Sequence, residues 1–153
     1  MLEQGATIPA VTLKDAEGAD FSLDAYRGKP LVVYFYPKAD TPGCTNEAKD
    51  FTALADEFAE AGVPVIGISK DKPARLKKFA EKYGLRVILA SDEEGAACET
   101  FGTWVEKSLY GRKYMGIERA TFLADADGVI RQVWPRVKVK GHAAEVLAAV
   151  QAR

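Results

Sequence analysis

The sequence predicts one α/β domain in which helices cover a central sheet. Two short apolar runs, Leu31–Tyr36 and Val63–Ser69, are too short for buried helices and are rich in β-branched or aromatic residues, so each indicates a strand covered on both faces. A segment with helical periodicity follows the first run, from Cys44 to Ala61. The 153 residues can bury a full core, and no linker or repeat divides them, so we expect residues 1–153 to form one domain.

A short hairpin is expected before the first apolar run. Val11–Leu13 and Ala19–Ser22 flank residues 14–18, whose aspartate and glycine are turn formers. Asp24–Tyr26 then reads as a short helical turn. The central sheet is therefore expected to carry an added N-terminal hairpin.

The helix predicted from Cys44 to Ala61 has one apolar stripe and ends at Gly62, a residue that favours the position after a helix. Residues of this stripe recur at helical spacing: Cys44, Ala48, Phe51, Ala55 and Phe58. Cys44 is thus expected in the first turn, at the edge of the interior.

The rest of the chain continues the alternation of helices and strands. We expect strands at Val87–Ala90, Ala120–Ala124 and Val129–Trp134, and helices at Lys72–Tyr83, Asp92–Phe101 and Ala143–Ala152. Residues 107–115 are too mixed in character to assign, and are either a loop or an extended segment.

Composition and charge argue against several classes of function. The net charge is −1 without basic blocks, which gives no footprint for nucleic acid or an anionic membrane. No apolar stretch is long enough for a membrane span, and the N-terminus does not resemble a secretory signal, so a reducing cytoplasm is expected. His142 is the only histidine and no CxxC pair is present, so no metal site is expected. We interpret His142 as a solvated residue near a helix start.

Cys44 is the candidate nucleophile. At a helix N-terminus, free backbone N–H groups and the helix dipole stabilise a thiolate. The alternative is a small buried helix residue, which free cysteines often are. The pattern P-x-x-x-T-x-x-C formed by Pro37, Thr41 and Cys44 favours the activated thiolate, with Pro42 and Gly43 tightening the turn. A thiolate that attacks a peroxide needs donors for both oxygens, and the Thr41 hydroxyl and first-turn N–H groups are expected to supply them.

The segment Phe35–Thr45 resembles the active-site segment of peroxiredoxins, most closely the PrxQ group, also called bacterioferritin comigratory proteins. The resemblance extends to the segments 28–30, Ile66–Ser69 and Glu118–Phe122, and so covers nearly the whole chain. It implies a thioredoxin-like fold with an added hairpin, and reduction of hydrogen peroxide or organic hydroperoxides through a cysteine sulfenic acid. It implies no metal or organic cofactor, since sulfur carries the redox change.

The resemblance also implies roles for individual residues. Cys44 would be the peroxidatic cysteine, Pro37 and Thr41 its pocket partners, and Arg119 the cation that stabilises thiolate and bound peroxide. Glu47 matches a residue common in the group. It is either a hydrogen-bond partner in the site or a favourable acid in the first helical turn.

The resemblance breaks down at the resolving cysteine. Many members carry it five residues after the peroxidatic one, where this chain has Lys49. Cys98 is the only second thiol; it either resolves the sulfenate, which requires movement, or fills a packing role. Without it, an external thiol from thioredoxin, glutaredoxin or a small molecule would attack directly. A monomer is favoured, with a dimer as the alternative.

Two other functions compete with this one. A thioredoxin-like disulfide reductase shares the fold, but such enzymes use C-x-x-C, and Cys44 is followed by Thr45, Asn46 and Glu47. A binding or chaperone-like module would leave the P-x-x-x-T-x-x-C pattern and Arg119 unexplained.

Overall fold

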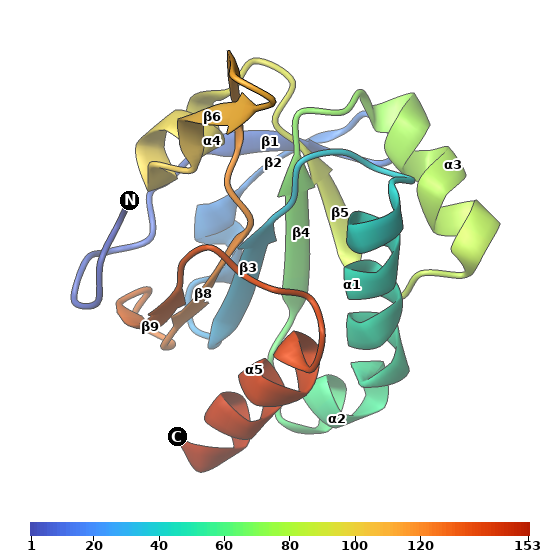
Figure 1. Ribbon diagram of the computed structural model, residues 1–153. Helices are drawn as coiled ribbons and strands as arrows, with labels where there is room; N and C mark the ends of the chain where they lie inside the picture. Colours follow the sequence, from blue (N-terminus) through green and yellow to red (C-terminus); the bar gives the residue numbers. More distant parts are fainter.

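A computed structural model describes residues 1–153 and confirms the α/β prediction (Figure 1). Seven strands form one sheet in the order β2-β1-β5-β4-β3-β8-β9, while β6 and β7 form a separate hairpin. The strands are β1 (Thr12–Asp15), β2 (Asp20–Ser22), β3 (Leu31–Phe35), β4 (Val65–Ser69), β5 (Ile88–Ser91), β6 (Trp104–Leu109), β7 (Arg112–Ile117), β8 (Ala120–Ala124) and β9 (Ile130–Trp134). The helices are η1 (Leu23–Tyr26, a 3-10 turn), α1 (Pro42–Ala53), α2 (Ala55–Glu60), α3 (Pro73–Tyr83), α4 (Ala96–Phe101) and α5 (His142–Ala152).

The sheet is mixed, as expected. Strands β3, β4 and β5 run parallel to one another, while β1, β8 and β9 pair antiparallel with their neighbours. All five residues of β3 are buried, which confirms a strand covered on both faces. The predicted N-terminal hairpin is β1–β2, and it extends the sheet next to β5.

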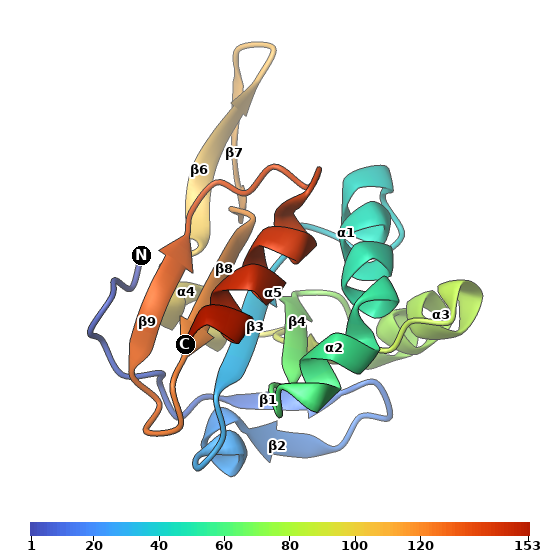
Figure 2. The same ribbon diagram turned by 90° about the horizontal axis from the view of Figure 1, so that it is seen from below.

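Two hydrophobic layers lie on the two faces of the sheet. Val32 and Tyr34 of β3 point into the layer that α1, α2, α3 and α5 cover. Val33 and Phe35 point into the layer that α4 and η1 cover. Figure 2 shows α1, α2 and α5 on the near side of the sheet and α4 on the far side. None of the helices is long and apolar enough to cross a bilayer.

A glycine in β4 makes room for a tyrosine in β3. Tyr34 and Gly67 are register partners in the parallel pair, and a Cβ built on Gly67 would lie 2.6 Å from Cζ of Tyr34. Since real side chains do not approach so closely, only glycine leaves space for this ring. Tyr34 in turn stacks on Phe51 of α1, with ring centroids 4.8 Å apart, and so fixes the helix against the sheet.

The helix predicted from Cys44 to Ala61 is in fact two helices. It begins at Pro42, and it breaks at Leu54, whose N–H bonds to the carbonyls of Phe51 and Thr52 rather than four residues back. The break changes the helix direction while Phe51 and Phe58 stay buried with their rings in contact, 5.9 Å between centroids.

The structure decides between the two alternatives for residues 107–115 and corrects the prediction for His142. Residues 107–115, predicted to be either a loop or an extended segment, are extended and lie in the β6–β7 hairpin. His142 is not solvated: it is 4% exposed, and its Nε2 lies 2.8 Å from Oγ1 of Thr121. Burial lowers the pKa of this imidazole, so it is a neutral part of the core beneath α5.

Candidate active site

Cys44 lies in the first turn of α1, where the chain returns from the end of β3 (Figure 1). The first backbone hydrogen bond of this helix runs from the N–H of Thr45 to the carbonyl of Thr41, at 2.8 Å. The amides of Gly43 and Cys44 have no helical acceptor because they lie in the first turn, and Pro42 before them has no N–H. Cys44 is only 2% exposed, so its nearly enclosed sulfur lies in the same helical turn as these two free donors.

Arg119 reaches this sulfur from a distant part of the sequence. Its Nη2 lies 3.3 Å from Sγ of Cys44, and its Nη1 donates to Oε1 of Glu47 at 2.7 Å. The register of β3 with β8 explains the approach: Phe35 pairs with Ala120, so the preceding Arg119 lies where β3 ends. A Cβ on Gly43 would lie 3.2 Å from Nη2, so glycine there gives the guanidinium its room.

Glu47 is the buried partner of Arg119. It is 1% exposed, and its second oxygen, Oε2, has no hydrogen-bond partner. Burial raises the pKa of this carboxyl to about 7, although the adjacent Arg119 favours the charged form. The pKa of Arg119 is also raised: burial acts to lower it, but the nearby Glu47 and Cys44 outweigh burial and stabilise the charged guanidinium. Of the two interpretations of Glu47, its position matches the one that places it in the site.

Thr41 and Pro37 lie on the exposed side of the cluster. The Thr41 hydroxyl donates to the carbonyl of Lys38 at 2.7 Å. With its hydrogen bonded to Lys38, the hydroxyl offers its oxygen as an acceptor, and donation to a peroxide oxygen stays a prediction. Pro37 is exposed, two residues after the end of β3.

The loop between β3 and α1 is tied to α3 and to the end of β4. Asp71 accepts the N–H of Ala39 at 2.8 Å, and Arg75 donates to the carbonyl of Ala39 at the same distance. Asp40 holds a left-handed backbone conformation, φ 61°, and its carboxylate accepts from the hydroxyl of Tyr83 at 2.6 Å. The sequence does not predict these contacts of the loop. Its only indication of them is that Asp71 closely follows a buried strand.

Cys98 is not brought to the site. It is fully buried in α4, in the hydrophobic layer on the opposite face of the sheet from Cys44. Its N–H donates to the carboxylate of Asp92 at 2.8 Å, and burial together with that carboxylate raises the pKa of its thiol. Lys49, at the position where many members of the PrxQ group carry a cysteine, is exposed on α1.

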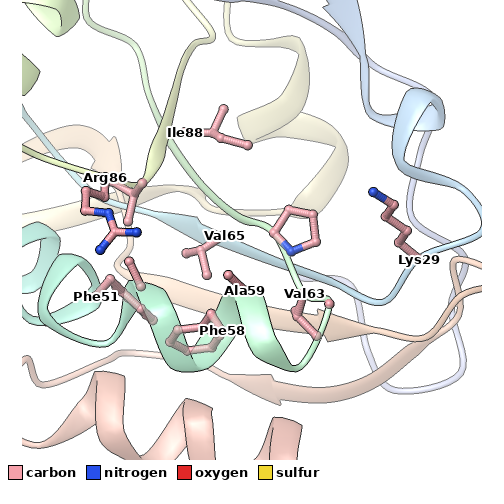
Figure 3. A pocket seen from close by; sticks show the side chains of 12 residues that line it. Lys29, Phe51, Phe58, Ala59, Val63, Val65, Arg86 and Ile88 are labelled. Carbon is pink, nitrogen blue, oxygen red and sulfur yellow. The ribbon is translucent and has the colours of Figure 1, made fainter.

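Other features do not offer a competing site. No group of three or more metal-ligating side chains is present. A cavity of about 340 Å³ lies at the N-terminal ends of β4 and β5, between α2 and the sheet (Figure 3). Its walls include Phe51, Phe58 and Val65, and Arg86 at its rim is paired with Asp56 at 2.8 Å. Ligands of open α/β sheets bind at the opposite, C-terminal ends of the strands, where Cys44 is.

Comparison with known proteins agrees with this geometry. Residues 4–133 match the model of the AhpC/TSA family. A putative peroxiredoxin bcp of Coxiella burnetii is 49% identical over 146 residues, 95% of this chain and 97% of that one. Peroxiredoxin Bcp of Escherichia coli K12 is 47% identical over 141 residues, 92% of this chain and 90% of that one.

Solved structures extend the likeness to the fold. The bacterioferritin comigratory protein of Xanthomonas campestris, described for its alkyl peroxide reduction activity, superposes with a TM-score of 0.91 at 42% identity over 98% of both chains. A cysteine-to-serine mutant of PrxQ from Xylella fastidiosa superposes with a TM-score of 0.94 at 34% identity, over 99% of this chain and 97% of that one.

Proposed function

This chain belongs to the AhpC/TSA family and is a thiol-dependent peroxidase, and on that premise we propose that Cys44 is the thiol that attacks the peroxide. The observation that carries the proposal is the contact of Arg119 with Sγ of Cys44, at 3.3 Å, in the first turn of α1. An arginine beside a sulfur at a helix N-terminus favours the anionic nucleophile and the negative charge that develops on the peroxide oxygens.

The reaction moves two electrons from sulfur to the peroxide. The thiolate of Cys44 attacks one oxygen; the S–O bond forms as the O–O bond breaks, and the leaving oxygen takes a proton to become water or an alcohol. The N–H groups of Gly43 and Cys44 and the guanidinium of Arg119 stabilise the lengthening O–O bond. The Oγ1 of Thr41 accepts the O–H of the incoming hydroperoxide, since its own hydrogen is bonded to Lys38.

Both hydrogen peroxide and organic hydroperoxides are proposed as substrates. The similar Xanthomonas protein is described as reducing alkyl peroxides. In this chain the sulfur of Cys44 adjoins an apolar layer that includes Ala48 and Tyr36, which suits an alkyl group better than a charged one.

The sulfenic acid on Cys44 is proposed to be reduced by an external thiol. Cys98 lies across the sheet and would have to leave a fully buried position to approach, whereas a disulfide needs Cα atoms within about 7 Å. The reductant is a thioredoxin, a glutaredoxin or a small thiol.

We further propose that residues 1–153 act as one domain, as a monomer, in the cytoplasm. Both cysteines are free thiols, which suits a reducing compartment.

The test combines two variants with mass spectrometry. Cys44→Ser is expected to abolish peroxide consumption with a thiol reductant, whereas Cys98→Ser keeps it. One equivalent of peroxide should leave a dimedone-reactive sulfenic acid on Cys44. Normal turnover in Cys44→Ser would overturn the assignment of the nucleophile, and a Cys44–Cys98 disulfide would overturn the proposal of an external thiol.

A further inference from the structure

The β6–β7 hairpin stands apart from the sheet. Its two strands pair only with each other, from Trp104 opposite Ile117 to Leu109 opposite Arg112. Figure 2 shows it projecting well beyond the rest of the molecule. Two of its large side chains near the tip are more than half exposed, Leu109 at 56% and Tyr110 at 97%. An element that buries so little of itself contributes little to the core.

The tip of the hairpin carries an aromatic residue where backbone geometry disfavours one. Tyr110 and Gly111 form the turn, with φ of 50° and 77°. Such turns favour asparagine and glycine, because a bulky side chain in the left-handed region is strained. A tyrosine that is both strained and 97% exposed gains nothing from contacts within this chain. This points to a contact with another molecule.

The base of the hairpin lies beside the active site. Strand alternation places Lys107, Leu109, Arg112 and Tyr114 on the same face. The base of the hairpin is fixed beside the site, because the N–H of Glu118, the neighbour of Arg119, donates to the carbonyl of Thr103 at 2.7 Å. The strand β7 also leads directly into the residues that carry the arginine of the site.

Further cations lie in a segment that contacts Arg119. The segment 136–140, which holds three cations, lies against the site, since the N–H of Val137 donates to the carbonyl of Arg119 at 2.9 Å. Arg112, Lys138 and Lys140 have no ion-pair partner in the structure.

We propose that the hairpin surface, defined as Lys107, Leu109, Tyr110, Arg112 and Tyr114 with Lys138 and Lys140, docks a protein dithiol reductant whose surface around its reactive thiol is acidic and apolar. The inference rests on the proposed function and narrows its reductant to a protein. An exposed tyrosine and leucine flanked by unpaired cations are typical of a protein-binding surface. This surface is too extended for a small thiol to contact all of it, so it fits a protein. A second copy of this chain fits poorly, because a two-fold interface would oppose the same positive charges.

The docked reductant would complete the thiol chemistry. Its thiolate attacks the sulfenic sulfur of Cys44; an S–S bond forms, the S–O bond breaks, and hydroxide leaves and takes a proton to become water. The second thiol of the reductant then attacks its own sulfur in this mixed disulfide. Cys44 is released as a thiolate, and the reductant leaves with an internal disulfide.

The test compares two reductants on the same preformed sulfenic acid. The double variant Leu109→Ser/Tyr110→Asn removes the apolar tip and keeps a residue that accepts the left-handed turn. Its rate constant for reduction by a bacterial thioredoxin should fall about 10-fold or more, while that with dithiothreitol stays within about twofold, as expected for loss of a docking contact. Arg112→Glu should slow thioredoxin most at low salt. Lys78→Glu, an exposed cation on α3, is the matched control and should change neither rate.

Several results would overturn the proposal. They are an unchanged thioredoxin rate in the tip variant, equal losses with both reductants, or reduction of the wild type by dithiothreitol but by neither thioredoxin nor glutaredoxin. A dimer in sedimentation velocity that the tip variant abolishes would assign the surface to a second copy instead. Failure of the proposed function is seen earlier and separately, as absence of a sulfenic acid on Cys44 before any reductant is added.

Discussion

Replacing Arg119 by methionine is expected to slow the reaction of Cys44 with peroxide far more than it destabilises the fold at neutral pH. Methionine keeps a long unbranched side chain but removes both donors, the one at 3.3 Å from Sγ and the one at 2.7 Å from Oε1 of Glu47. The two lost contacts have different consequences, which the structure separates.

The lost contact with sulfur acts on the rate. Removing one preorganised donor from a transition state that develops negative charge costs about 2.7–4 kcal/mol, or about 10²–10³ in rate. The lost contact with Glu47 acts on stability. Removing one partner of a buried ion pair usually costs about 3–5 kcal/mol. Here the carboxyl already has its pKa raised to about 7 with Arg119 present, so without the cation it takes up a proton at pH 7 and the cost is smaller.

The assay is stopped-flow measurement of the second-order rate constant of the reduced protein with hydrogen peroxide, beside urea unfolding at pH 7. Arg131→Met is the matched control: Arg131 also pairs with a carboxylate, that of Asp125, but is 62% exposed and distant from the sulfur. Adding Glu47→Gln to Arg119→Met should recover stability at high pH and leave the rate low. A rate within about threefold of the wild type in Arg119→Met would contradict a role of the guanidinium in the transition state, since one lost donor should cost much more.

Three further outcomes are expected. Folding raises the pKa of Glu47 from 4.5 to about 7, so the folded state holds the proton to higher pH, and the free energy of unfolding should fall by up to about 3 kcal/mol as pH rises from 4.5 to 7. Urea titrations of Glu47→Gln should not show this fall, and a rise in stability of the wild type over that range would contradict the effect of burial on Glu47. Gly67→Ala should destabilise by about 1–3 kcal/mol in urea unfolding, because its Cβ would lie 2.6 Å from Tyr34. Gly116→Ala should cost less, because its nearest neighbours are Lys107 at 3.3 Å and the exposed Tyr114 at 3.4 Å; equal costs would contradict the role of space at Gly67. Iodoacetamide should label Cys98 only after unfolding, since burial raises its thiol pKa and excludes reagent; labelling in the native protein would contradict its placement.

The sequence was most informative where one physical pattern decides the structure. The continuous apolar run of β3 is fully buried, and the apolar stripe of α1 faces the core through Cys44, Ala48 and Phe51. The break at Leu54 escaped prediction, because no glycine or proline marks it and the stripe continues on both sides. Likewise, the apolar surroundings of His142 come from α1 and β9 and leave no local signal.

The hairpin was left unassigned for the same kind of reason. Hydrophobic periodicity reflects burial. Only the base of the hairpin is buried, at Ile117 and in part at Trp104, so the strands show no clear alternation of apolar and polar residues along their length. The positive φ of Tyr110 could not be predicted either, because asparagine or glycine is the usual residue at this turn position. Sequence patterns therefore describe the β6–β7 hairpin least well, because most of its side chains do not pack in the core.

The contact between Arg119 and Cys44 depends on strand register more than on any local motif. Because Phe35 pairs with Ala120 in an antiparallel ladder, the residue before β8 lies beside the loop that leaves β3, and 75 residues of sequence separation become 3.3 Å. A slip of one residue would exchange the faces of β8 and turn the guanidinium away from the sulfur. Burial resists such a slip, since Ala120, Thr121 and Phe122 are all fully buried and Thr121 meets His142 beneath α5. The core under α5 therefore maintains the geometry of the active site, and variants that loosen it should lose peroxide reactivity before they unfold.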